Sequence, residues 1–314
     1  MRILVTGSGR LGVSLLKPLL QSQHEVIGVI LDGRKASAFR RWLNPRVGRW
    51  IGGRSSLGGL AVKNGLPIYW LDQMNEQDLT PIRAAAPDLI LVGGFGIIFK
   101  PPLLEIPRVG CVNMHSSLLP RHRGPNPFFA VLMQGEAESG VTFHVMTPQI
   151  DDGRILDQSA FPITASDSIF TIYQKSCDRA GERVAAVMDR IETEGLAGAP
   201  QDPEAATYDK RPTVDDAWLD WEKPAEQLER LVRAITPSPF PRFLFRGNLV
   251  YVASVTYSAA PVSEPPGTVI AVRPKVRVAT GEGVLTIRFA FTSHPFMWLW
   301  PSRWNRPEIG EKLN

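Results

Sequence analysis

The sequence of 314 residues has few cysteines and lacks any long hydrophobic run. Its two cysteines, Cys111 and Cys177, do not have the spacing of a metal or redox motif, so they indicate buried thiols of a reducing compartment. No apolar run approaches the roughly 20 residues that cross a bilayer. The amino terminus enters a strand-like pattern rather than a signal peptide. These features predict a cytoplasmic protein without a membrane partner.

Acidic residues are missing between Asp32 and Asp72, and this stretch contains eight cations. Two tryptophans, Trp42 and Trp50, are interleaved with them. Cations neutralise phosphates and aromatic rings stack on bases, so residues 33–56 are interpreted as a basic arm that binds nucleic acid. The alternative is a solvated loop whose arginines have no specific role. The formal net charge of +4 favours a polyanionic partner only weakly.

Short apolar runs alternate with helical patterns over residues 1–195, which we predict to form one catalytic domain. The expected strands are residues 2–7, 25–31, 67–71, 88–94, 111–115, 140–146 and 155–162. The expected helices are residues 10–22, 55–64, 76–86, 125–135 and 168–194. Nearly continuous apolar strands suit a parallel sheet that is covered on both faces. The alternation predicts an α/β fold with a doubly wound, Rossmann-like, mostly parallel sheet.

A second domain is predicted after a linker. Residues 196–216 are rich in Pro, Gly, Ala and Asp, as linkers are. Residues 217–314 begin with an amphipathic helix at 221–235. Short strand candidates separated by turn residues follow at 242–246, 249–257, 267–273, 275–279 and 284–290. This pattern predicts a small C-terminal β-barrel of the OB-like type.

A glycine motif, Gly7-Ser8-Gly9-Arg10-Leu11-Gly12, stands between the first strand and the first helix. With Asp32 at the end of the second strand, it matches the fingerprint of dinucleotide-binding oxidoreductases. Alternatively, the three glycines only form a tight turn that lets the helix pack closely on the sheet. The polar chemistry of the chain gathers near residues 113–154 instead, which favours the packing interpretation.

The segment "NMHSSLLPRHRG" places Asn113 and His115 two residues apart at the carboxyl end of an expected strand, so both side chains lie on one face. Asp151 follows in "QIDDGRIL". An amide, an imidazole and a carboxylate at one site could stabilise an oxyanion, transfer a proton and hold the charge of the imidazole. A structural histidine and an ordinary Asp-Asp-Gly turn are the alternative.

Residues 112–156 resemble the signature region of the folate-dependent formyltransferases. That family includes methionyl-tRNA formyltransferase, sugar-nucleotide N-formyltransferases and the hydrolase domain of formyltetrahydrofolate dehydrogenase. The shared features are Asn113 with His115, the Ser117–Pro120 loop, Arg123-Gly124, Gly140–Thr142, and Asp151 with Gly153. "LDWEKPAEQLERLVRAITPSPFP" and "PPGTVIAV" resemble the C-terminal domain of the longer members, so the resemblance covers nearly the whole chain.

The resemblance implies transfer of a formyl group from 10-formyltetrahydrofolate, with neither a metal nor NAD. Asn113 and a protonated His115 would stabilise the negative charge on the formyl oxygen. Free imidazole has a pKa of about 6.5, and Asp151 is expected to keep His115 charged at neutral pH. The residues implied to bind folate are Phe95, Gly96, Ile97, Ser117, Leu118, Leu119, Pro120, Thr147, Pro148, Gln149 and Ile150.

The acceptor implied by the resemblance is the amino group of methionyl-tRNA, because the basic arm, with Arg40, Arg41 and Arg46, stands where tRNA-dependent members carry a basic loop. An amino-sugar nucleotide or another small amine is the alternative, because His144 replaces a Met that is usual in the tRNA enzymes. A 10-formyltetrahydrofolate hydrolase is a further alternative, since the same oxyanion site serves both reactions. An inactive RNA-binding module is disfavoured by the intact set of Asn113, His115 and Asp151.

Overall fold

The computed structural model describes residues 1–36, 56–292 and 307–314, so Arg40, Arg41 and Arg46 of the basic arm lie outside the described residues. The chain divides into two compact units. The first consists of Met1–Gly124, Glu138–Pro162 and Ile172–Tyr208, and the second of Pro125–Ala137, Ile163–Thr171 and Asp209–Asn314. This division assigns 125–137 and 163–171 to the second unit. The sequence instead predicted continuous segments, with a catalytic domain that ends at residue 195 and a linker that ends at residue 216, and these boundaries stay a prediction.

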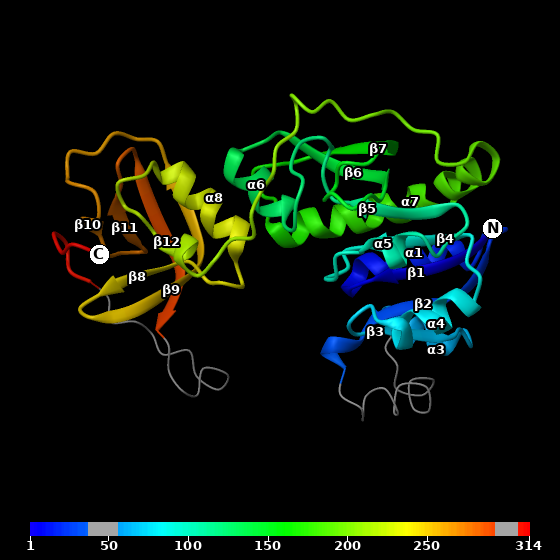
Figure 1. Ribbon diagram of the computed structural model, residues 1–314. Helices are drawn as coiled ribbons and strands as arrows, with labels where there is room; N and C mark the ends of the chain where they lie inside the picture. The colour runs from blue at the N-terminus through cyan, green and yellow to red at the C-terminus, as the bar shows by residue number, and fades with distance from the viewer. Residues whose placement is uncertain (37–55, 293–306) are drawn as a thin grey trace. The chain divides into compact units, whose positions relative to one another are not determined.

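A seven-stranded sheet forms the centre of the first unit (Figure 1). Its order is β3-β2-β1-β4-β5-β6-β7, in which the first five strands are parallel, β6 is antiparallel to β5, and β7 is antiparallel to β6. The strands are β1 (Arg2–Gly7), β2 (Glu25–Asp32), β3 (Ile68–Leu71), β4 (Leu89–Gly93), β5 (Gly110–His115), β6 (Glu138–Val145) and β7 (Ile155–Pro162). The strand order reverses between β1 and β4, as it does in doubly wound folds. The prediction of a mostly parallel, Rossmann-like sheet is therefore confirmed.

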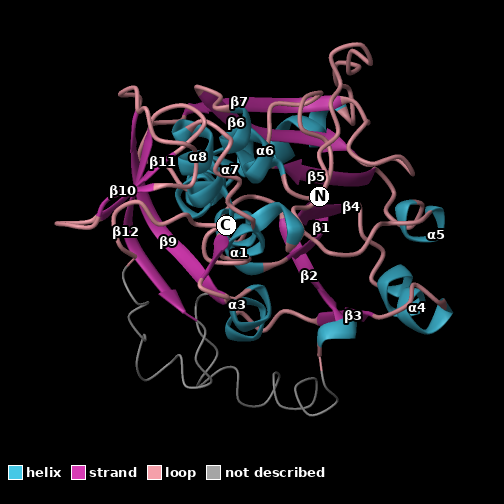
Figure 2. Ribbon diagram, turned by 90° about the vertical axis from the view of Figure 1, so that its left-hand side faces the viewer, coloured by secondary structure: helices cyan, strands magenta, loops and turns pink. Residues whose placement is uncertain are grey.

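Helices cover both faces of this sheet (Figure 2). On one face lie α1 (Gly9–Leu19), α3 (Leu57–Lys63) and the part of α7 (Ile169–Glu194) that belongs to the first unit. On the other face lie α4 (Glu76–Ala84) and α5 (Pro101–Leu104). The sequence did not predict α5, because four residues are too few for a helical repeat. A short 3-10 helix, η1 (Gly33–Lys35), follows β2.

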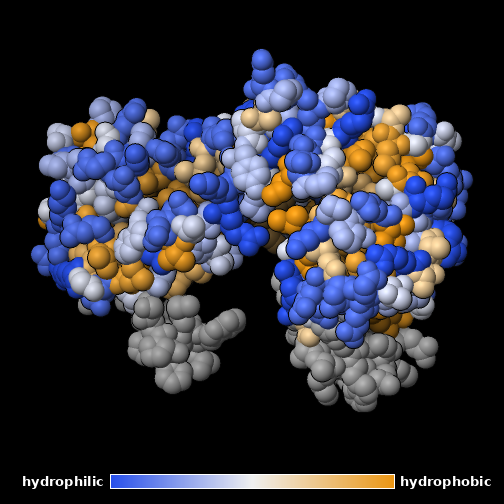
Figure 3. Space-filling model, in the orientation of Figure 1, coloured by the Kyte–Doolittle hydropathy of each residue, from blue (hydrophilic) through white to orange (hydrophobic). Residues whose placement is uncertain are grey.

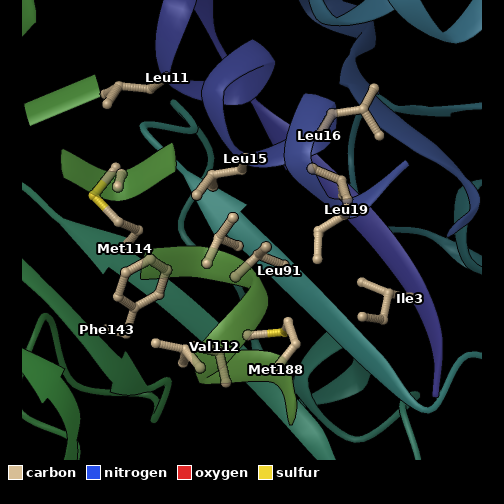
Figure 4. Packing of buried hydrophobic residues seen from close by; sticks show 14 of the residues in the cluster. Ile3, Leu11, Leu15, Leu16, Leu19, Leu91, Val112, Met114, Phe143 and Met188 are labelled. Atoms are coloured by element: carbon tan, nitrogen blue, oxygen red, sulfur yellow. The ribbon is translucent and has the colours of Figure 1, made fainter. Parts of the chain in front are cut away.

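The larger hydrophobic core of the first unit lies between the sheet and the face formed by α1 and α7. Leucines at the helical repeat of α1 point toward the strands and α7 (Figure 4). The residues in contact there include Leu11, Leu15, Leu16, Leu19, Leu91, Val112, Met114, Phe143 and Met188. A core this closely packed holds the carboxyl ends of the central strands in one arrangement.

The second unit contains a five-stranded antiparallel sheet in the order β10-β11-β12-β9-β8. These strands are β8 (Arg242–Phe245), β9 (Asn248–Ser258), β10 (Val269–Ala271), β11 (Val276–Ala279) and β12 (Val284–Thr292). Two helices, α6 (Pro127–Gln134) and α8 (Ala225–Ile235), pack against each other, and α8 packs on β9 and β12. The 3-10 helix η2 (Asp215–Ala217) precedes α8. The antiparallel sheet agrees with the predicted C-terminal domain of short strands.

On the face shown in Figure 3, hydrophilic residues cover most of the surface of each unit, with smaller hydrophobic areas among them. No helix in the described part of the chain combines the length and the apolar character that crossing a bilayer requires.

Candidate active site

The glycine motif forms a tightly packed turn between β1 and α1. A Cβ atom on Gly7 would lie 2.4 Å from the carbonyl oxygen of Gly93. At the start of α1, the hydroxyl of Tyr173 accepts hydrogen bonds from the backbone amides of Arg10 at 2.8 Å and Leu11 at 3.2 Å. In a dinucleotide site, amides at this position would face the pyrophosphate. Because Tyr173 engages them here, the packing interpretation of the glycines is favoured.

The polar residues of the predicted site meet near the carboxyl end of β5. Asn113 and His115 are the fourth and sixth residues of β5, and Asp151 lies in the loop between β6 and β7. Oδ1 of Asp151 is 3.4 Å from Nδ2 of Asn113, and its Oδ2 is 3.5 Å from Nδ1 of His115. The backbone amide of Gly124 donates a hydrogen bond of 2.9 Å to Oδ2 of Asp151. The structure therefore brings the three predicted catalytic residues together.

The second nitrogen of the His115 ring, Nε2, lies 2.8 Å from the backbone carbonyl oxygen of His122. A carbonyl oxygen can only accept a hydrogen bond, so Nε2 must carry a proton. In the neutral ring this leaves the lone pair on Nδ1, the nitrogen that faces Asp151. The backbone around residues 115–122 thus selects one tautomer of His115.

Burial decides the charge of His115. Desolvation lowers the pKa of His115 below its ordinary value of 6.5, although Asp151 and the bond to His122 act in the opposite direction. The prediction that Asp151 keeps His115 protonated at neutral pH is therefore wrong, because the desolvation of a ring that is only 7% exposed outweighs the attraction of the carboxylate.

Asp151 itself stays ionised. Burial raises the pKa of Asp151, but His115, His144 and the amide of Gly124 together outweigh burial and bring it down to about 2. At neutral pH the site therefore holds a carboxylate beside a neutral imidazole. This pair can accept one proton at Nδ1 of His115 and then stabilise the resulting cation.

His144 is a fourth member of the cluster. It lies opposite Asn113 in the antiparallel pairing of β5 with β6, and its ring is only 2% exposed. Its Nε2 is 3.1 Å from Nδ2 of Asn113 and 3.4 Å from Oδ1 of Asp151, and its Nδ1 is 3.0 Å from the carbonyl oxygen of Val145. Sequence reasoning considered His144 only as a guide to the acceptor, because its proximity to Asn113 depends on the register between the two strands.

The predicted folate-binding residues lie in three loops. Residues 95–97 follow β4, and Phe95 and Ile97 pack against the smaller core together with Met146. In the loop after β5, Ser117 is fully buried and donates a hydrogen bond of 2.8 Å to the carbonyl oxygen of Arg121, and Leu119 is 2% exposed. In the loop after β6, residues 148–150 are exposed. The structure thus divides these residues into buried and exposed ones, and their role in binding folate stays a prediction.

No group of three or more His, Cys, Asp or Glu side chains that could hold a metal ion occurs among residues 1–36, 56–292 and 307–314. The two cysteines are free and buried.

Comparison with known proteins gives matches over most of the chain. The family model described as formyl transferase matches residues 1–188, and the one described as formyl transferase, C-terminal domain, matches residues 212–290. The chain is 33% identical to the methionyl-tRNA formyltransferase of Halorhodospira halophila over 288 residues, which is 91% of this chain and 90% of that protein. It is also 33% identical to the enzyme of that name from Ectopseudomonas mendocina, over 91% of this chain and 88% of that one.

Among solved structures, an N-formyltransferase from Helicobacter canadensis in complex with folinic acid and dTDP-3-aminofucose is similar, with a TM-score of 0.68. The likeness covers 93% of this chain and 100% of that one at 18% sequence identity. At this identity the likeness bears on the fold, which it supports over both units.

Proposed function

The chain belongs to the formyl transferase family, and from this premise we propose that it transfers the formyl group of 10-formyltetrahydrofolate to the amino group of methionyl-tRNA. The observation that carries the proposal is the 33% identity to methionyl-tRNA formyltransferases over 91% of the chain. The cluster of Asn113, His115, His144 and Asp151 supplies the chemistry. A cytoplasmic location, predicted from the two cysteines, remains part of the proposal.

In the proposed reaction the acceptor amine attacks the formyl carbon, and negative charge develops on the formyl oxygen. The amide N–H groups of Asn113 stabilise this oxygen, an interaction whose loss costs a factor of about 10² to 10³ in rate. Nδ1 of the neutral His115 takes the proton that the attacking nitrogen loses. Asp151, 3.5 Å away, stabilises the imidazolium. The same proton then passes to the departing folate nitrogen when its bond to the formyl carbon breaks, so His115 returns to its neutral form.

We propose a different role for His115 from the one expected from the sequence. A protonated His115 would have had no lone pair to accept the proton of the amine. The pKa of His115 is lowered by its burial, so the ring is neutral at neutral pH and is ready to act as a base. The role of Asp151 changes accordingly, since it stabilises the cation that forms during the reaction rather than one present beforehand.

A second candidate acceptor is an amino-sugar nucleotide. It is favoured by His144, which stands where the resemblance to tRNA-dependent members leads us to expect a Met. Nothing in the chemistry of the cluster separates the two amines, because each presents the same nucleophile to the formyl carbon. A hydrolase, in which water replaces the amine, uses the same groups.

An acceptor screen tests the proposal. The protein is incubated with 10-formyltetrahydrofolate and methionyl-tRNA, a panel of amino-sugar nucleotides, or free amino acids, and kcat/KM is measured for each. We expect the highest kcat/KM with methionyl-tRNA. A preference for an amino-sugar nucleotide would move the assignment to the second candidate. Release of formate without any amine, at a rate comparable with transfer, would identify a hydrolase.

The basic arm provides a second test of the acceptor. Replacing Arg40, Arg41 and Arg46 together with Ala should weaken the binding of methionyl-tRNA and flatten its dependence on salt, because fewer phosphate charges are neutralised. The matched control replaces three exposed cations of the first unit, namely Lys17, Arg83 and Arg108. Equal kinetics with methionyl-tRNA in both triple variants would argue against tRNA contact by the arm.

A further inference from the structure

Two residues that face the ring of His115 have unusual backbone conformations. His122, whose carbonyl oxygen accepts from Nε2, has a φ of 60°, and Asp151, whose carboxylate faces Nδ1, has a φ of 54°. Both values lie in the left-handed region, which costs conformational energy for residues other than glycine. Such conformations persist where surrounding interactions hold them.

One segment of the chain makes hydrogen bonds to both of these residues. We call residues 199–208 the return strap. It lies after α7, within the stretch that the sequence predicts to be a linker. Like Asn113, His115 and Asp151, it belongs to the first unit. Its hydrogen bonds therefore lie within a single compact unit.

Thr207 of the return strap binds the loop that contains His122. Its hydroxyl oxygen accepts a hydrogen bond of 2.7 Å from the backbone amide of His122. Its carbonyl oxygen accepts one of 2.9 Å from the amide of Arg123, and its amide donates one of 3.3 Å to the carbonyl of Pro120. Three hydrogen bonds therefore hold the peptide group that contains the carbonyl selecting the tautomer of His115, and the two peptide groups before it.

Gln201 of the return strap binds the loop that contains Asp151. Its Nε2 donates hydrogen bonds of 2.8 Å each to the carbonyl oxygens of Asp151 and Gly153. Its Oε1 accepts from the guanidinium of Arg123, at 3.1 Å from Nε and 2.8 Å from Nη2. One amide thus connects the loop after β5 to the loop after β6, a task that requires a donor and an acceptor in the same side chain.

We propose that the return strap is a positioning element of the active site, in which Thr207 and Gln201 hold the two groups that determine the tautomer and the charge of His115. Neither residue is needed to touch the substrate. The consequence for activity rests on the proposed function, whereas the consequence for the His115 ring does not. The segment predicted as a linker is then part of the catalytic apparatus.

The test compares Thr207→Val and Gln201→Met with the wild-type chain. Thr207→Val removes the hydroxyl acceptor at nearly constant volume, and Gln201→Met removes the amide at similar length. Gln23→Met is the matched control, because Gln23 is exposed and its amide bonds to Asp189, away from the site. Thr207→Ser keeps the hydroxyl and serves as the conservative variant.

The first readout is ¹⁵N NMR of histidine-labelled protein, in which the His115 signals are assigned from a His115→Gln spectrum. In the wild type we expect the Nε2-protonated tautomer of His115. Thr207→Val should show a mixture of tautomers, and Thr207→Ser should restore the wild-type signals. Gln201→Met should lower the titration midpoint of His115 further, because Asp151, which raises it, is no longer held in place.

The second readout is steady-state kinetics of formyl transfer. We expect Gln201→Met and Thr207→Val to lower kcat about 10- to 100-fold, as small misplacements of reacting groups do, with the KM for the formyl donor changed less than about threefold. Gln23→Met should keep wild-type kinetics. If wild-type protein transfers no formyl group, the proposed function fails, and the NMR readout still decides the positioning role.

Unchanged tautomer and titration midpoint of His115 in both variants would overturn the proposal. If Gln201→Met does not fold, Gln201→Ala replaces it, because alanine removes the amide without adding a charge or placing an apolar chain beside the two carbonyl groups. A Gln201→Ala protein with a wild-type midpoint for His115 would overturn the role of Gln201 in the same way.

Discussion

Replacing Asp151 with Asn tests the central electrostatic claim of the mechanism. The substitution keeps the size of the side chain and removes its negative charge. In the ground state His115 is neutral at neutral pH, so the lost charge has little effect on that state. In the transition state Nδ1 of His115 carries a proton, so the loss of the negative charge removes the electrostatic stabilisation of this cation.

The distance of 3.5 Å between Nδ1 of His115 and Oδ2 of Asp151 sets the size of the effect. At an effective dielectric constant of about 20, this separation corresponds to roughly 5 kcal/mol of attraction between two unit charges. Asparagine still presents the dipole of its amide oxygen to the ring, so part of this attraction is preserved. We expect a net loss of about 3 kcal/mol, which is a fall in kcat of about 10².

The assay measures kcat and KM with 10-formyltetrahydrofolate and methionyl-tRNA between pH 5 and pH 9. Activity should fall on the acid side as His115 becomes protonated and can no longer accept a proton. Because Asp151 raises the pKa of His115, its replacement should move this acid limb to lower pH while the plateau falls. Asp178→Asn, which removes a carboxylate that pairs with Arg10 at the surface, is the control.

Two results would refute this reasoning. A fall in kcat of less than about fivefold would mean that the carboxylate does not stabilise a cation in the transition state. A shift of the acid limb to higher pH would mean that the lost interaction does not act on His115. A urea unfolding curve for each variant separates either result from a loss of folded protein.

Three further predictions follow from contacts in the first unit. His115→Ala should lower kcat by about 10² or more with little change in the KM for the formyl donor, and an unchanged rate would remove His115 from the mechanism. Tyr173→Phe should lower the free energy of unfolding by about 1 kcal/mol, because two amides at the start of α1 lose their acceptor. Urea titration measures this free energy, with Tyr257→Phe at an exposed position as the control. Gly153→Ala should destabilise the protein by about 3 kcal/mol or more, because the new Cβ would lie 1.8 Å from the carbonyl oxygen of Val145; a normal urea midpoint would contradict the packing of that loop.

Local sequence patterns were enough to predict most helices and strands of the described chain. The apolar run at 2–7 coincides with β1 and the run at 88–94 contains β4, because the burial of a central strand needs only a short continuous stretch of apolar residues. The helix expected at 125–135 is α6, which begins with Pro127 and is followed by Gly135 in the left-handed conformation. The short helix α5 was not predicted, since a single turn has no periodicity to detect.

The candidate site was predicted in part. Asn113 and His115 were paired correctly, because the two-residue repeat of a strand is a local property. His144 was not placed in the cluster, because only the antiparallel register of β6 against β5 sets it opposite Asn113. Gln201 and Thr207 were assigned to a linker, because their partners lie far away in the chain, 85 positions in the case of His122 and Thr207.

By itself the sequence determined most of the strands and helices, the glycine turn, and the amide, imidazole and carboxylate that were candidates for one site. The tertiary structure decided the charge of His115 and the identity of the groups that hold it. The physical reason is that secondary structure follows from neighbours along the chain. The pKa of a buried ring depends instead on all surrounding groups and on its separation from water, and both exist only in the folded protein.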